Sequence, residues 1–182
     1  MSLPVFRTAR LTLRPLAATD STAMHEIFGD PEAMRFWDAP AAVDVAETAQ
    51  RVEWLTQSDP RWHAAWAVIA HADDTLVGFV NYHHVVPAYR RLEIGYILAR
   101  RCWGQGLMHE ALMPFLDHCF VALNAHRVEA MIEPGNAASV RLVERLGFRC
   151  EGGPLRDRLL VAGEFRSVNV YALLAPERVV AR

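Results

Sequence analysis

The chain has 182 residues, of which 52% are apolar and 22% charged, a composition typical of one globular domain with a substantial core. Its formal net charge of −2 excludes general nucleic-acid binding, which needs dense positive charge against the phosphate backbone. All 19 basic side chains are arginine, so the lack of lysine excludes Schiff-base lysines and lysine general bases. We expect residues 1–182 to form one domain.

Signals for export, membrane insertion and disulfide formation are weak in this sequence. No stretch approaches the roughly 18 consecutive apolar residues of a membrane span, and the first residues lack the charged and apolar regions of a signal peptide. The cysteines, Cys102, Cys119 and Cys150, are too few and too scattered for a disulfide framework. We therefore expect a cytoplasmic protein that binds no membrane, and these patterns carry no signal for its oligomeric state.

The first half of the chain predicts a strand, a helical region and then a strand meander. Residues 10–16 alternate between polar and apolar side chains, which is the period of a half-buried strand. Asp20 and Asp44 are typical N-caps, and Pro31 favours the first turn of a short helix. Short polar turns separate the later strand patterns, so these strands should pair antiparallel. In chain order we predict a strand at 10–16, helices at 20–28, 32–36 and 44–55, and strands at 63–70, 75–86 and 89–98.

The second half predicts two amphipathic helices among further strands. An apolar stripe at helical spacing begins at Leu107 and ends at Leu123. Asn136 is a typical N-cap for the next helix, and Gly147 is a typical C′ residue at its end. Further strands are predicted at 127–132, 156–161 and 165–174. The whole order predicts an α/β fold, with a mixed, mostly antiparallel sheet of about seven strands and helices on both faces.

A glycine-containing turn, Arg101-Cys102-Trp103-Gly104-Gln105-Gly106, joins the strand at 89–98 to the first of these helices. Glycine permits a tight backbone, and amides that converge at a helix N-terminus favour a phosphate group. The turn therefore predicts a seat for a pyrophosphate. A dinucleotide-binding fold would need a third glycine where His109 stands, and a nucleoside-triphosphate loop would need a lysine.

Segments around this turn carry a family resemblance. Arg101, Gly104 and Gly106 match the Gln/Arg-x-x-Gly-x-Gly/Ala signature of the GNAT superfamily of acyl-CoA-dependent N-acetyltransferases. More narrowly, four segments resemble the branch that acetylates protein N-termini, the ribosomal-protein (RimJ/RimL-type) enzymes: residues 10–16, 93–96, 136–148 and 171–174. The resemblance covers nearly the whole chain, and it is more specific for the fold and the acyl donor than for the acceptor.

The resemblance implies acetyl-CoA as co-substrate, bound where a strand splays from its parallel neighbour at 127–132. It implies a bulge in the splayed strand, which we place at Gly95, and a pantetheine arm that pairs with the backbone around Ile97 and Leu98. Asn136 would hydrogen-bond the pantetheine, although a plain helix N-cap is an equally good interpretation and both roles can hold together. Backbone amides would hold the pyrophosphate, namely those of Cys102, Trp103, Gly104, Gln105 and Gly106.

Two residues are candidates for the proton transfers that amide formation requires. Glu93 is a carboxylate within an otherwise apolar strand beside the splay, and we predict that it acts as the general base, directly or through a water. The alternative is a surface ion pair with Arg90 or Arg91. Ser139 matches the serine that the resemblance implies near the thiol, whereas Val143 stands where many superfamily members place an acid tyrosine. The alternative for Ser139 is a hydrogen bond to backbone in the first helical turn.

Histidines, tryptophans and one cysteine have less defined roles. The chain has eight histidines, but no pair has a metal-ligand spacing with a third partner, so we expect no metal. His83 or His84 could face the acceptor, although solvated and core histidines are more common. Trp37 and Trp54 lie in the region that roofs the acceptor site in the family, where aromatic residues more often pack than bind. Cys119 falls on the buried stripe, which favours a packed thiol over an acyl-enzyme nucleophile.

These observations predict an acetyl-CoA-dependent N-acetyltransferase in which a primary amine attacks the thioester directly. The acceptor is open between a protein N-terminus and a small amine such as an amino acid, polyamine or drug, because fold analogy does not settle acceptor choice. The competing class is a CoA-binding module without catalysis, which would keep the glycine turn but need neither Glu93 nor Ser139. The presence of both residues favours the enzyme.

Overall fold

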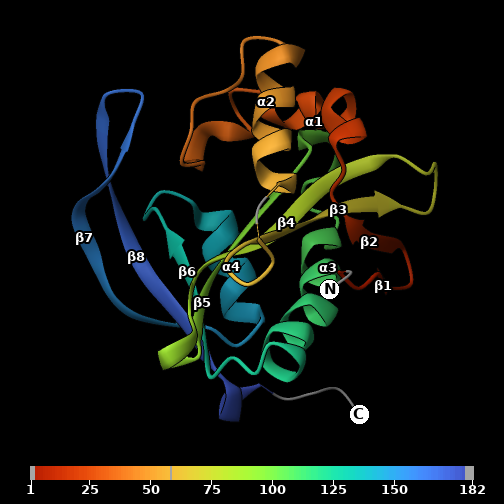
Figure 1. The fold of residues 1–182 in the computed structure, drawn as a ribbon. Helices are drawn as coiled ribbons and strands as arrows, with labels where there is room; N and C mark the ends of the chain where they lie inside the picture. The colour runs from red at the N-terminus through yellow and green to blue at the C-terminus, as the bar shows by residue number, and fades with distance from the viewer. Residues whose placement is uncertain (1–2, 58, 179–182) are drawn as a thin grey trace.

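The computed structural model describes residues 3–57 and 59–178, in which helices flank one twisted sheet (Figure 1). The strands are β1 (Phe6–Arg7), β2 (Leu11–Pro15), β3 (Ala64–Ala70), β4 (Leu76–Val86), β5 (Arg91–Leu98), β6 (Arg127–Ile132), β7 (Arg149–Val161) and β8 (Glu164–Leu174). The α-helices are α1 (Ser21–Phe28), α2 (Val45–Thr56), α3 (Leu107–Asp117) and α4 (Ala137–Arg145). Among the described residues, no helix is both long and apolar enough to cross a bilayer.

The sheet has the order β1-β2-β3-β4-β5-β6-β8-β7. Every neighbouring pair in it is antiparallel except β5 and β6, which run parallel. The predicted mixed α/β fold is therefore confirmed, with eight strands among the described residues instead of about seven. β1 was missed because two residues are too few to show alternation. The first half of β7 was missed because its side chains are exposed and carry no apolar pattern.

The one parallel pair of the sheet is also its split. β5 and β6 pair only through Arg91, Leu92 and Glu93 of β5, after which β5 continues to Leu98 without a partner on that side. The splayed pair that the family resemblance implies is therefore present. The bulge expected at Gly95 is not: this residue stands in regular register opposite Asn81 of β4, and the register of that ladder shifts instead between His83 and Val86.

The first-half helices differ in part from their sequence signals. Asp44 caps α2 as predicted, because its Oδ1 accepts a hydrogen bond of 2.8 Å from the amide of Glu47. Asp20 precedes α1, but its carboxylate binds the guanidinium of Arg14 instead of a helix amide, at 2.6 Å. The piece predicted after Pro31 is reduced to a 3-10 turn over Met34–Phe36.

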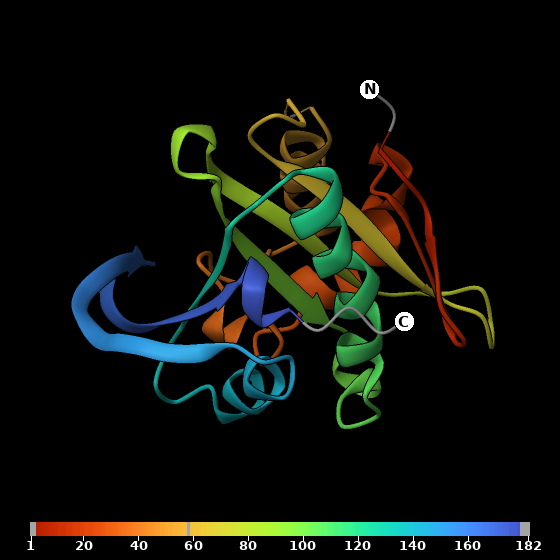
Figure 2. The same cartoon turned by 90° about the horizontal axis from the view of Figure 1, so that it is seen from below.

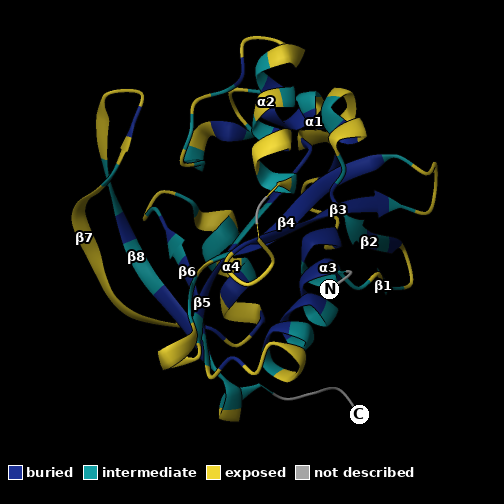
Figure 3. Cartoon of the chain, viewed as in Figure 1, coloured by how far each residue is buried: buried dark blue, intermediate teal, exposed yellow. Residues whose placement is uncertain are grey.

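Helices cover both faces of the sheet, as two perpendicular views show (Figures 1 and 2). On β4, Phe79 packs against Phe28 of α1, with ring centroids 5.7 Å apart, whereas Tyr82 packs against Phe115 of α3, at 6.5 Å. Positions 79 and 82 differ by an odd number, so their side chains leave opposite faces of the strand. α1 and α3 therefore cover opposite faces, each over its own buried apolar layer, whereas β7 is exposed along most of its length (Figure 3).

Candidate active site

The glycine turn follows the free end of β5 and begins with a 3-10 turn over Arg100–Cys102. Gly104 and Gly106 then adopt left-handed backbone angles, with φ of +74° and +75°, and Gly106 is the N-cap of α3. A side chain at either position would strain the backbone, because only glycine reaches this region without cost. The two glycines of the motif are therefore required by the path of the chain itself.

The amides of this turn divide into two groups. Those of Cys102 and Trp103 already donate to the carbonyls of Ala99 and Arg100, at 2.9 and 3.1 Å. Within the described part of the chain, the amides of residues 104–109 donate to no protein acceptor. The candidate phosphate seat is therefore shifted toward the helix relative to the sequence expectation, and it combines the glycine amides with the first turn of α3.

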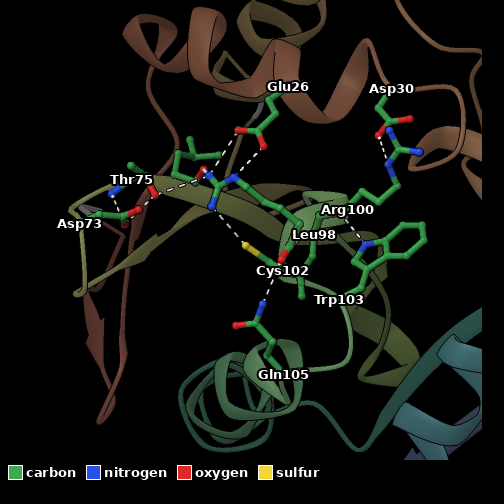
Figure 4. A network of polar contacts seen from close by, with 11 residues as sticks. Glu26, Asp30, Asp73, Thr75, Leu98, Arg100, Cys102, Trp103 and Gln105 are labelled. Atoms are coloured by element: carbon green, nitrogen blue, oxygen red, sulfur yellow. Dashed lines mark hydrogen bonds and ion pairs between the residues drawn. The ribbon is translucent and has the colours of Figure 1, made fainter.

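Side chains of the turn hold it in place (Figure 4). The guanidinium of Arg101 binds the carboxylate of Glu26 on α1, with Nε 2.7 Å from Oε1, and this contact raises the pKa of Arg101. The preceding residue, Arg100, forms an ion pair of 3.0 Å with Asp30. The Nε2 of Gln105 donates to the carbonyl of Arg101, at 2.9 Å. The side chain of Arg101 therefore anchors the turn against α1.

Arg10 also holds the glycine turn in place, a role that the sequence did not predict. Its Nη1 donates to the carbonyl of Gln105, at 3.0 Å, and its Nε lies 2.6 Å from the carboxylate of Glu110 on α3. The residues it joins are far apart in the chain, so no local pattern could have revealed the contact.

The free edge of β5 presents backbone groups to the gap beside β6. Ala99 donates to Val77, at 2.8 Å, so the alternation of an antiparallel ladder directs the amide and carbonyl of Ile97 to β4. The same alternation directs those of Tyr96 and Leu98 to the gap. The indole Nε1 of Trp103 donates a hydrogen bond of 3.0 Å to the carbonyl of Leu98, so this carbonyl already has a partner. The amide of Leu98 and both backbone groups of Tyr96 are thus the pairing groups at the gap.

Two hydroxyl groups meet where α4 approaches β5. The Tyr96 hydroxyl lies 2.6 Å from Ser139 Oγ, and burial raises the pKa of Tyr96, so the phenol keeps its proton at neutral pH. Asn136 Oδ1 accepts a hydrogen bond of 3.2 Å from the amide of Ser139, which makes Asn136 the N-cap of α4. Tyr96 shares its face of the sheet with Tyr82, because its partner across the ladder is Val80. This is the face that α3 covers.

Glu93 lies on the opposite face of the same strand. Glu93 is 8% exposed as a whole residue, and its Oε2 lies 3.1 Å from His84 Nδ1 and 3.8 Å from His83 Nε2. The alternative ion pair with Arg90 or Arg91 is not formed: Arg90 binds Asn124 and Arg91 binds Glu129. Burial, more than any neighbouring charge, lowers the pKa of His83 to about 4, so this imidazole is neutral at neutral pH.

A cavity of about 520 Å³ lies beside the arginines of the turn, and a larger one, of about 730 Å³, opens on the Glu93 face between α1, α2 and β4. Aromatic and apolar side chains dominate the wall of the larger cavity, Trp37 and Trp54 among them, and His83 and His84 also line it. Its acidic lining residues are Asp38 and Glu47, and Glu47 is paired with Arg51. The tryptophans that sequence reasoning left undecided therefore line a cavity beside Glu93.

The histidine pair was underrated for a physical reason. Adjacent residues in a regular strand point to opposite faces, so His83 and His84 did not suggest a cluster. Their proximity to Glu93 depends on the pairing of β4 with β5 and on a φ of +47° at His84. Cys119, in contrast, behaves as its position on the stripe predicted: it is fully buried, and burial raises the pKa of its thiol.

Comparisons with known proteins show the class of protein to which this chain belongs. The family described as "Acetyltransferase (GNAT) domain" matches residues 10–149. The "Uncharacterized N-acetyltransferase p20" of Bacillus licheniformis is 30% identical over 171 residues, which cover 93% of this chain and 96% of that protein. The "Putative ribosomal N-acetyltransferase YdaF" of Bacillus subtilis is 33% identical over 105 residues, 58% of this chain and 57% of that protein.

A solved structure agrees at the level of the fold. Spermidine N-acetyltransferase from Vibrio cholerae, in complex with CoA and spermine, superposes with a TM-score of 0.80 at 23% identity, over 93% of this chain and 98% of that one. This chain therefore shares the fold of that acetyltransferase. The chain belongs to the GNAT family, and it is an N-acetyltransferase.

Proposed function

We propose that this protein transfers an acetyl group from acetyl-CoA to the primary amine of a protein N-terminus, by direct attack of the amine on the thioester. The observation that carries the proposal is the placement of two sets of groups around the free end of β5. The open amides lie at the glycine turn, and the hydroxyl pair of Tyr96 and Ser139 lies on the face of the sheet that α3 covers. The buried carboxylate of Glu93 lies on the opposite face, beside the larger cavity.

We also propose that residues 1–182 form one domain, because the sheet joins both ends of the described chain.

The donor would bind along the turn and the gap. Its pyrophosphate would accept hydrogen bonds from the amides of residues 104–109, where the helix dipole also favours negative charge. Its pantetheine arm would pair with the amide of Leu98 and the backbone of Tyr96, as an extra strand would. The thioester would then lie in the gap beside β5, between Glu93 on one face of the sheet and Ser139 on the other.

The transfer removes two protons from the amine nitrogen and replaces the carbon–sulfur bond of the thioester with a carbon–nitrogen bond. Glu93 accepts a proton from the ammonium group, so that the amine lone pair can attack the thioester carbon. The new carbon–nitrogen bond forms, and the carbon–sulfur bond breaks. Ser139, supported by Tyr96, gives its proton to the departing thiolate and takes up the second proton of the attacking nitrogen, which leaves a neutral amide, free CoA and one proton on Glu93. The buried Cys119 supports this direct route, because a thiol in the core is closed to an acyl-enzyme step.

A small amine with an apolar body is the second candidate acceptor, and the cavity wall favours it. Aromatic side chains suit one apolar group near a single amine. A polyamine would need several carboxylates, whereas Glu47 is already neutralised by Arg51, which leaves Asp38 at the wall. We therefore expect the weakest turnover with spermidine.

An acceptor panel tests the proposal. Release of CoA is measured with peptides whose N-termini are free or blocked, with small aromatic amines, and with spermidine. We expect turnover with free N-termini and none with blocked ones. If acetyl-CoA raises the melting temperature but no acceptor releases CoA, the protein is a CoA-binding module and the proposed reaction is wrong.

The hydroxyl pair gives a separate prediction. Ser139→Ala should lower kcat by about 100-fold, the low end of the range for general acid catalysis, while the KM for acetyl-CoA changes little. Tyr96→Phe, which removes the hydroxyl that positions Ser139, should give a smaller loss in the same direction. Full turnover in Ser139→Ala would instead make Ser139 an ordinary first-turn serine.

A further inference from the structure

Three potential metal ligands converge at the edge of the larger cavity. His83 pairs directly with Glu93 across the β4–β5 ladder, and the positive φ of His84 falls where that ladder loses its register. Both imidazoles consequently face the same carboxylate, with His84 Nδ1 at 3.1 Å and His83 Nε2 at 3.8 Å from Glu93 Oε2. One ligand atom from each residue lies within 4.8 Å of the other two.

This spacing fits a small divalent ion. A tetrahedral zinc ion with bonds near 2.1 Å holds its ligand atoms roughly 3.4 Å apart; the two distances to Glu93 lie on either side of this value, and all three ligand atoms lie within 4.8 Å of one another. Two imidazoles and one carboxylate are also the ligand set of open zinc sites, which keep a fourth position for water or substrate. Here the fourth position would face the cavity, because His83 and His84 are part of its wall.

The chemistry of the ligands selects among metals. Imidazole nitrogens suit zinc, copper, nickel and cobalt, whereas magnesium and calcium require oxygen ligands. The side chain of Glu93 is 11% exposed and that of His84 is 67% exposed, so an ion can enter from the solvent and meet a buried carboxylate. His83 Nδ1 is buried without a hydrogen-bond partner among the described residues. The lack of such an outer partner should weaken binding by about 10- to 100-fold relative to a fully supported site.

We propose that His83 Nε2, His84 Nδ1 and the carboxylate of Glu93 bind a divalent transition-metal ion such as Zn²⁺, and that the bound ion inhibits acetyl transfer. Inhibition follows because the metal takes the carboxylate lone pair that would accept the ammonium proton. Binding is independent of the proposed function, whereas inhibition rests on the role of Glu93 in it.

Direct binding is the first test. The full-length protein is stripped with a chelator and titrated with Co²⁺, whose visible absorption reports nitrogen and oxygen ligation, and with Zn²⁺ by calorimetry. We expect one equivalent per chain, and at least about tenfold weaker binding in His84→Ala and Glu93→Gln. The matched control is His71→Ala, which removes an exposed histidine that contacts Thr12 and should bind like the parent. No stoichiometric binding, or equal binding in His84→Ala, would overturn the site.

Activity separates the two halves of the proposal. With an acceptor from the panel, Zn²⁺ at saturating concentration should abolish turnover, and chelator should restore it. If the metal binds but turnover persists, the inhibitory part is wrong. If no acceptor is turned over but Co²⁺ still binds at these residues, the proposed function fails and the metal site stands.

Discussion

Glu93→Gln is expected to lower kcat/KM for the amine acceptor by about 10²- to 10⁴-fold, the range for loss of a general base. The amide has nearly the same shape as the carboxylate and can still contact His84, so the fold should be kept. It cannot accept a proton from an ammonium group, so turnover must wait for the rare free amine. Turnover of the variant should rise steeply with pH as the fraction of free amine rises, whereas turnover of the parent should depend less steeply on pH. The pH–rate profile of both proteins measures the effect.

A matched control separates proton transfer from general electrostatics. Glu47→Gln removes a carboxylate from the wall of the same cavity, but this carboxylate is held by Arg51. It should raise the KM of a cationic acceptor by at most a few-fold, about what a solvent-exposed charge contributes, and it should keep the pH dependence of the parent. Near-normal turnover of Glu93→Gln with the pH dependence of the parent would remove Glu93 from the mechanism.

Gly104→Ala is expected to weaken acetyl-CoA binding by about 10- to 100-fold. A methyl group at Gly104 meets no protein atom within 4 Å, so it projects into open space, which we expect the pyrophosphate to fill. A displaced phosphate would lose at least one charge-assisted hydrogen bond, and about 1.5 to 3 kcal/mol for such a bond corresponds to the stated change. Thermal stabilisation by acetyl-CoA, or calorimetry, gives the measurement.

The chain supplies a close control for backbone strain. Gly163, in the turn between β7 and β8, also has a positive φ, +84°, and a methyl group there also meets nothing within 4 Å. Each alanine should cost about 1 to 2 kcal/mol of folding free energy, because the left-handed conformation is equally unfavourable for both. Gly163→Ala should therefore melt like Gly104→Ala yet bind acetyl-CoA like the parent. Equal binding by the two variants would refute the phosphate seat.

Local patterns in the sequence were sufficient to predict the glycine turn and the helix caps of the candidate site. Gly104 and Gly106 could be interpreted from the chain alone, because a positive φ is a property of one residue and its neighbours. The cap at Asn136 and the apolar stripe of α3 are local for the same reason, since a helix brings together residues three and four positions apart. These features also carried the family resemblance, and with it the split sheet.

The acceptor side depended on contacts between distant residues. Which groups face Glu93, and on which face of β5 it lies, follows from the register of β4 against β5 and from one irregular residue, His84. Arg10 reaches the glycine turn across 95 positions, and Tyr96 reaches Ser139 across 43. Sequence periodicity reports which face of an element is buried, but not what another element places against it. The amino-acid sequence by itself thus determined the fold and the glycine turn of the candidate site, whereas the tertiary structure alone decided the surroundings of the candidate base and the cavity beside it.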